Sequence, residues 1–354
     1  MKEKTLQRIF IVCFLLLCLL PSVGMLVFGE TEPVANEILA QRPRLTVSGK
    51  LNKNVLSDLT DYIADRFALR REFVNAWAVL NAGLFHTSAE DQVVLGTDGW
   101  LYYAPTLDDY MGRALSDEEL DLAARNLAAI QAYAEERNAT FLFTIAPNKN
   151  SLYPGNMPGY IPSGHASSNA VKIVPYLERY GVNYVDLFEV FNAEDEVLYY
   201  RTDSHWNDRG AALAADSLLA ASGREGVYSA GPFAPADAHR GDLYDMLFPL
   251  GTDTEEAESY AGFRFTTRNN PNGGNAMKIE TECADGEGVL LCWRDSFGIS
   301  LYPYLADSFS EALFLRSGSY DLSMIDEFGA DVVLIELVER DLYRIASDKA
   351  FSTP

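Results

Sequence analysis

The turn at residues 201–211 reads Arg201-Thr202-Asp203-Ser204-His205-Trp206-Asn207-Asp208-Arg209-Gly210-Ala211. It places a carboxylate two residues before one of the four histidines, between a strand expected at 197–200 and a helix expected at about 209–221. Asn207 or Asp208 is placed to cap that helix. An imidazole that works as a base needs a group that fixes its tautomer, and Asp203 is suited to orient His205. The pair also suits a structural turn or a metal ion.

A serine that completes an acyl-transfer site lies in the stretch Val289-Leu290-Leu291-Cys292-Trp293-Arg294-Asp295-Ser296-Phe297-Gly298. A buried strand is expected at 289–293 and a helix at 299–309, so Ser296 stands at a strand-to-helix corner. The first amides of that helix point outward and can receive an oxyanion. Asp295 or Ser296 would also serve as a helix cap. The presence of the Asp-x-His turn favours the acyl-transfer site.

These motifs resemble the SGNH-hydrolase-like family that includes the alginate O-acetylation proteins and their DHHW relatives. The resemblance is carried by Thr202-Asp203-Ser204-His205-Trp206-Asn207 and Arg294-Asp295-Ser296-Phe297-Gly298, and it spans about residues 55 to 345. Four further segments support it: 94–103, 146–154, 241–247 and Val338-Glu339-Arg340.

The resemblance implies that Ser296 is the nucleophile, His205 its base and Asp203 the orienting carboxylate, with no cofactor and no metal. The chain order Asp, His, Ser and the presence of Arg294, where the usual Gly-Asp-Ser block has glycine, both resemble the alginate-type branch. The family also implies a membrane-bound O-acyltransferase partner that supplies the acetyl group.

Composition restricts the compartment and the partners. The 354 residues are 48% hydrophobic and carry a formal net charge of −23, which repels phosphate backbones, so nucleic acid is excluded as a partner. Residues 9–28 carry no charge and follow Lys2, Lys4 and Arg8. This pattern predicts a single-pass anchor in the cell membrane with an extracytoplasmic catalytic domain, and a cleaved signal peptide is the alternative. Cys283 and Cys292 could pair or lie in the core.

The pattern along the chain predicts three regions: an anchor at 1–29, a stalk and two helices at 30–90, and an SGNH-like domain at 91–354. Helices alternate with strands in the last region, beginning with a helix that Ser116 caps. This alternation predicts a three-layer α/β/α domain with a parallel sheet. Prolines, glycines and weak periodicity indicate a loop-rich insertion at 222–280.

In such a sheet, ligands bind beyond the carboxyl ends of the strands. Asn148 and Lys149 follow a strand expected at 140–146 and are candidates for an oxyanion donor or a substrate clamp. Arg294 could contact an anionic sugar or pair with an acid. Tyr153 could stack on a sugar ring or pack in the core.

The leading hypothesis is a transfer of acetyl through Ser296 to an alcohol of a polysaccharide acceptor. The alternatives are a secreted carbohydrate acetylesterase, a metal-dependent hydrolase built on Asp203 and His205, and a non-catalytic glycan-binding or assembly module. The metal alternative is weak because His86, His165 and His239 show no ligand spacing.

Overall fold

The computed structural model describes residues 2–31, 39–113, 115–164, 167–269 and 273–353. The chain forms two compact units. The first unit comprises residues 1–89 with 247–252, and the second comprises residues 90–246 with 253–354. Part of the expected stalk, His165 and residues 270–272 of the expected insertion lie outside the described residues.

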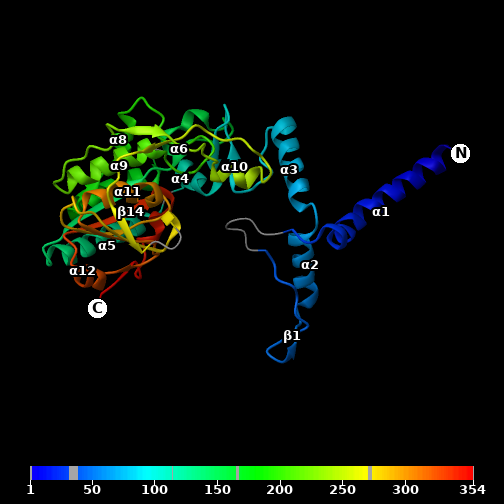
Figure 1. Cartoon of the computed structure of the whole chain (residues 1–354), viewed down its shortest axis with the longest axis horizontal. Helices are drawn as coiled ribbons and strands as arrows, with labels where there is room; N and C mark the ends of the chain where they lie inside the picture. The colour runs from blue at the N-terminus through cyan, green and yellow to red at the C-terminus, as the bar shows by residue number, and fades with distance from the viewer. Residues whose placement is uncertain (1, 32–38, 114, 165–166, 270–272, 354) are drawn as a thin grey trace. The chain divides into compact units, whose positions relative to one another are not determined.

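The first unit is built from helices and one short hairpin (Figure 1). Its elements are α1 (Lys2–Phe28), β1 (Thr46–Val47), β2 (Lys50–Leu51), α2 (Val55–Arg66) and α3 (Arg70–Leu80), which a π-helical turn at Asn81–Phe85 extends. The two helices predicted between residues 55 and 84 are therefore confirmed.

The expected membrane anchor coincides with α1, the helix that contains the uncharged run at residues 9–28. In the part of the chain that the structure describes, no helix is both long enough and apolar enough to span a bilayer. The anchor is thus not supported by the structure.

A seven-stranded mixed sheet forms the centre of the second unit, in the order β6-β5-β14-β11-β12-β10-β9. The strands are β5 (Thr140–Ala146), β6 (Tyr184–Val185), β9 (Thr266–Asn269), β10 (Lys278–Glu282), β11 (Val289–Trp293), β12 (Glu311–Leu315) and β14 (Val332–Val338). The first five in the order pair in parallel, as predicted, whereas β10 is antiparallel to both of its neighbours. The connection from β9 to β10 is too short for the crossover that a parallel pair requires.

Helices cover both faces of this sheet, so the three-layer prediction is confirmed. One face packs against α8 (Leu187–Asn192), α9 (Asp208–Ala221) and α11 (Gly298–Ser308). The other packs against α5 (Asp117–Glu135), α7 (Asn169–Tyr180) and α12 (Ser323–Phe328) (Figure 1). Alternate strand residues serve opposite faces, as Leu290 and Leu291 show.

Short elements complete the second unit. They are β3 (Val93–Leu95), β4 (Leu101–Tyr103), α4 (Leu107–Tyr110), α6 (Lys149–Leu152), β7 (Phe233–Pro235), α10 (Asp242–Leu247), β8 (Glu258–Tyr260), β13 (Tyr320–Asp321), β15 (Phe351–Ser352) and 3-10 turns at Ala104–Thr106, Pro154–Asn156, Gly273–Asn275 and Glu339–Arg344. The last residue of α10, Leu247, belongs to the segment 247–252, which is part of the first unit.

Two local predictions need correction. The strand expected at 197–200 is reduced to a single bridge between Tyr199 and Trp206. The segment 222–280 is not only loop, because β9 and the first residues of β10 extend the central sheet. Of the two alternatives for Cys283 and Cys292, the core position is confirmed, because both are buried and do not form a disulfide.

Candidate active site

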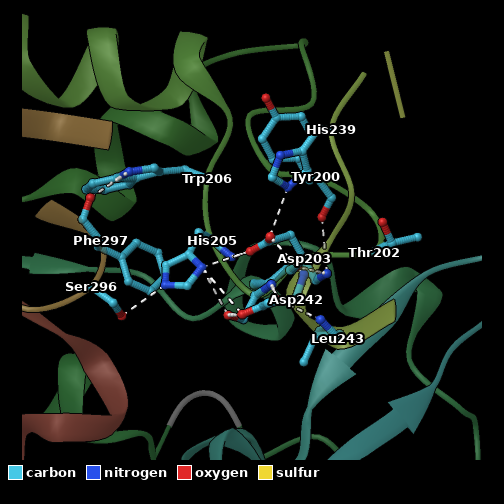
Figure 2. A network of polar contacts seen from close by, with 12 residues as sticks. Tyr200, Thr202, Asp203, His205, Trp206, His239, Asp242, Leu243, Ser296 and Phe297 are labelled. Atoms are coloured by element: carbon cyan, nitrogen blue, oxygen red, sulfur yellow. Dashed lines mark hydrogen bonds and ion pairs between the residues drawn. The ribbon is translucent and has the colours of Figure 1, made fainter. Parts of the chain in front are cut away.

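Ser296, His205 and Asp203 form a hydrogen-bonded row (Figure 2). The Oγ of Ser296 lies 2.9 Å from Nε2 of His205, and Nδ1 of His205 lies 2.8 Å from Oδ1 of Asp203. A carboxylate beside Nδ1 selects the tautomer that carries its proton there, so Nε2 is left to accept the serine proton. The arrangement has the geometry of a nucleophile, a base and an orienting acid.

Secondary structure brings the two halves of this row together. Ser296 lies between β11 and α11, and the turn before α9 presents His205. Asn207 is the residue that caps α9, since its side chain accepts from the amide of Gly210 at 3.0 Å. Trp206, almost fully buried, donates its indole N–H to the carbonyl of Phe297 at 3.2 Å. This bond ties the histidine turn to the serine corner.

Electrostatics favour the charged form of Asp203. Burial alone would raise the pKa of this carboxyl, but hydrogen bonds from His205 and His239 outweigh burial and hold the pKa well below its usual range. Burial likewise opposes the charge on His205, yet the hydrogen bond to Asp203 and the negative charge there raise its pKa above the usual value. Asp203 is therefore negatively charged, and His205 beside it binds a proton more readily than an ordinary histidine does.

Charged side chains of both signs support the backbone of the turn. The carboxylate of Glu255 accepts from the amides of Arg201 and Thr202 at 2.9 and 2.8 Å. On the other side, Nζ of Lys149 donates to the carbonyls of Tyr200, Arg201 and Asp203. Burial lowers the pKa of Lys149 to about 7.

Two further side chains in the site were not predicted from the sequence. Asp242 accepts from the amide and the hydroxyl of Ser204 at 2.7 and 2.6 Å, and its Oδ2 lies 3.6 Å from Nδ1 of His205. Nε2 of His239 lies 2.9 Å from Oδ2 of Asp203. Asp242 belongs to a segment that supports the family resemblance, whereas His239 gives no sequence signal, being separated by 36 residues from its partner.

Amide groups for an oxyanion are available beside the serine. Within the described residues, the amide of Ser296 has no hydrogen-bond partner, whereas the amide of Phe297 donates to Asp295 at 2.8 Å. Gly298 begins α11 and lies so close to Arg294 that a Cβ there would come within 2.4 Å of Cδ. The free amide of Ser296, just before this helix, is suited to a developing negative charge.

The other three polar candidates, Asn148, Lys149 and Arg294, are buried and differ in their hydrogen-bond partners. Asn148 is buried, and both polar atoms of its side chain lack partners in the described part of the chain, so its role as a donor stays a prediction. Lys149 is not placed as a substrate clamp, because its ammonium group is occupied by three carbonyls under the turn. Arg294 is buried and donates to the carbonyls of Gly274, Ala276 and Asp295, and no acid among the described residues forms an ion pair with it.

Tyr153 also has a structural position. Its hydroxyl accepts from the amide of Leu198 at 2.9 Å, and its ring packs against Trp100 and Tyr199. Burial raises the pKa of this phenol. The core-packing alternative, rather than sugar stacking, fits these contacts.

Among the described residues, one group of side chains could hold a metal ion. Asp203, His205 and Asp242 offer ligand atoms that lie within 4.8 Å of one another. Nδ1 of His205 is already directed at the carboxylate of Asp203, and the oxygens of Asp242 accept from Ser204. A metal ion here would displace the hydrogen bonds that orient the base, so the residues fit a hydrogen-bonded row better than a metal centre.

Part of the chain is similar to known proteins. The model of the family "SGNH hydrolase-like domain, acetyltransferase AlgX" matches residues 93–259, a range that includes Asp203 and His205 and ends before Ser296. The probable alginate O-acetylase AlgJ of Pseudomonas syringae is 30% identical over 169 residues, which are 44% of this chain and 40% of AlgJ. The Pseudomonas aeruginosa protein of the same name is 28% identical over 154 residues, 43% of this chain and 38% of that protein. The chain thus spans about two fifths of the length of these relatives.

Solved structures share the fold. Bacillus cereus PatB1 with a sulfonyl adduct superposes with a TM-score of 0.55 at 19% identity, over 71% of this chain and 95% of PatB1. A DHHW family protein from Eubacterium siraeum superposes with a TM-score of 0.53 at 18% identity, over 73% of this chain and 92% of that protein.

Proposed function

We propose that this chain, whose residues 93–259 match the SGNH hydrolase-like acetyltransferase family, transfers acetyl groups through Ser296 to a polysaccharide. The observation that carries the proposal is the row in which Ser296 Oγ, His205 and Asp203 are joined at 2.9 and 2.8 Å. A serine is a weak nucleophile until a base takes its proton, and this row supplies the base and its orienting acid.

In the first half of the reaction, Nε2 of His205 takes the hydroxyl proton while Oγ of Ser296 attacks the acetyl carbonyl of the donor. The oxyanion meets the free amide of Ser296, and one such donor typically contributes about 3 to 4 kcal/mol. The donor's leaving group departs with the proton from His205, and acetyl-serine remains.

In the second half, an alcohol of the acceptor attacks the acetyl-serine. His205 takes the alcohol proton and then returns a proton to Oγ of Ser296, so the enzyme is regenerated and the acetyl ester lies on the acceptor. Water in place of the alcohol would give acetate, which is the esterase alternative.

An unpaired cation beside the site supports a carboxylate-bearing acceptor such as the uronate units of alginate, the polymer in the names of the relatives. The guanidinium of Arg340 has no hydrogen bond or ion pair among the described residues. It lies 5.2 Å from the ring centre of Tyr103 and 5.6 Å from that of Phe297, which neighbours Ser296. A planar guanidinium held between two rings is pre-organised to bind a carboxylate.

The location and the acetyl supply belong to the same proposal. The basic residues before an uncharged run support a domain that works outside the cytoplasm, in a cell envelope or on a membrane surface. The family resemblance supports a membrane-bound O-acyltransferase as the partner that provides acetyl.

The experiment uses the full chain with a chromogenic acetyl ester and a uronate oligosaccharide. We expect an acetyl adduct on Ser296 by mass spectrometry, acetylated oligosaccharide, and the loss of both in Ser296→Ala. Ser300→Ala, four residues further along the chain on α11, is the matched control and should retain both. Release of acetate without acetylated sugar would establish an esterase, and absence of the adduct from the wild-type protein would favour a glycan-binding module.

A further inference from the structure

The carboxylate of Asp203 is shared between two histidines (Figure 2). Its Oδ1 accepts from the amide and from Nδ1 of His205 at 2.9 and 2.8 Å. Its Oδ2 accepts from Nε2 of His239 at 2.9 Å and from the amide of Asp242 at 3.1 Å. The carboxylate therefore has two donors on each oxygen, which fixes the rotation of its plane.

The imidazole of His239 is held firmly in place. Its ring stacks on that of Tyr200, with centroids 3.8 Å apart and planes 14° from parallel. Its backbone exchanges two hydrogen bonds with Glu255, at 2.8 and 2.7 Å. The side chain of the same Glu255 accepts from the amides of Arg201 and Thr202. Glu255 therefore holds both His239 and the turn in place.

The loop that carries His239 also packs tightly on the turn. A Cβ at Gly241 would come within 2.2 Å of the carbonyl oxygen of Thr202, so only glycine permits this approach. That carbonyl accepts from the amide of Tyr244 at 3.1 Å. The backbone of His239 consequently cannot move away from Asp203 without separating the loop from the turn.

We propose that His239 is a positioning residue for the acetyl-transfer row, which it extends to Ser296, His205, Asp203 and His239. By donating to Oδ2, it keeps Oδ1 of Asp203 directed at Nδ1 of His205, and so keeps Nε2 directed at Ser296. This inference rests on the proposed function, because a positioning residue acts through the base that it orients.

Two substitutions separate the hydrogen bond from the ring. His239→Phe keeps a ring that can stack on Tyr200 but removes the donor, whereas His239→Gln keeps an N–H donor near Nε2 but removes the ring. The probes are a serine-directed sulfonyl fluoride, for the rate of Ser296 modification, and the chromogenic acetyl ester, for kcat and KM. Thermal unfolding reports whether each variant is folded, and His86→Phe, an exposed histidine of the first unit, is the matched control.

We expect His239→Phe to lower kcat and the modification rate about tenfold with KM little changed, as befits a lost hydrogen bond to a charged group. His239→Gln should retain at least about half of the wild-type kcat, since it keeps the donor. Should His239→Phe not fold, His239→Met, which also lacks a donor, takes its place.

Equal losses in the Gln and Phe variants would assign the effect to ring packing and overturn the inference, as would an unchanged rate in His239→Phe. In both cases Ser296 of the wild-type protein is still modified by the probe, so the proposed function stands. A wild-type protein whose Ser296 is never acetylated or sulfonylated refutes the proposed function and this inference with it.

Discussion

Replacing Asp203 by asparagine tests how the row chooses the tautomer of His205. An asparagine side chain can face His205 with its oxygen or with its NH₂ group. With the oxygen toward His205, both donors there stay paired, and the NH₂ group faces His239 and the amide of Asp242. His239 can then accept through Nε2 by moving its proton to Nδ1, and the single unmatched contact is the 3.1 Å bond from Asp242.

With the NH₂ group toward His205, the unmatched contact is the shorter 2.9 Å bond from the amide of His205. Nδ1 would also have to accept, which moves the histidine proton to Nε2 and removes the base. The first arrangement sacrifices the longer bond and keeps the base, so we expect it to prevail.

The expected loss of activity follows from this choice. In the preferred arrangement, the substitution removes only the negative charge of residue 203. The bond from Nδ1 of His205, which is worth about 1.5 to 3 kcal/mol to a charged group, becomes a neutral bond worth about 0.5 to 1.5 kcal/mol. Together with the weaker stabilisation of the imidazolium in the transition state, kcat should fall roughly 10- to 100-fold. A wrong tautomer, in contrast, costs on the order of 10⁴-fold in a comparable triad.

The assay measures kcat on the chromogenic ester and the rate of Ser296 sulfonylation for Asp203→Asn, Asp203→Ala and Asp203→Asn in His239→Phe. The double variant lacks the acceptor for the amide, so we expect it to fall to the level of Asp203→Ala. If Asp203→Asn alone is already as inactive as Asp203→Ala while still folded, the reasoning about the second histidine is wrong.

The remaining predictions concern stability, pH and metal ions. Lys149→Met leaves three carbonyls without their donor and should lower the free energy of unfolding by roughly 3 kcal/mol or more, as measured in urea. The pKa of His205 is raised above its usual 6.5, so the rate of acetyl-enzyme formation should rise with pH through a midpoint above 6.5, because the base must be unprotonated. In Asp203→Ala, burial then dominates and the midpoint of the residual rate should fall. Dialysis against EDTA should leave kcat unchanged, because the proposed steps use a serine and a histidine; a loss that Zn²⁺ restores would support the metal alternative.

The sequence was sufficient to predict the row itself because each member stands next to a regular element. Ser296 follows a strand whose apolar run is continuous, and His205 precedes a helix with a recognisable cap at Asn207. Parallel strands place their carboxyl ends at one edge of the sheet, so polar residues that follow them are expected to meet there. This rule applies to Ser296 after β11, whereas the segment before His205 forms only a single bridge, and its meeting with Ser296 was implied by the family resemblance.

The same reasoning misplaced Lys149 and missed His239. Both residues act through backbone or side-chain groups more than 30 residues away, in turns that have no hydrophobic period. A lysine after a strand predicts a cation at the sheet edge, but the sequence does not show whether that cation faces a ligand or a buried turn. The antiparallel strand β10 was missed for a similar reason, because its pairing with β12 depends on tertiary contacts rather than on its own residues.

The irregular shape of the turn explains why buried charges surround it. A turn without helical or sheet bonding leaves its N–H and C=O groups unpaired, and each buried group must find a partner. Here carboxylates take the amides and Lys149 takes the carbonyls, so the two sets of backbone groups are held by charges of opposite sign.

Burying these charges opposes folding, as the lowered pKa of Lys149 indicates. Neutral partners would cost less, but they would hold the backbone less strongly, because hydrogen bonds to charged groups are about twice as strong as neutral ones. A base that must keep Nε2 within hydrogen-bonding distance of a serine on another segment requires that rigidity. Substitutions that neutralise Glu255 or Lys149 should therefore lower activity even in variants that remain folded, because the turn can then move relative to Ser296.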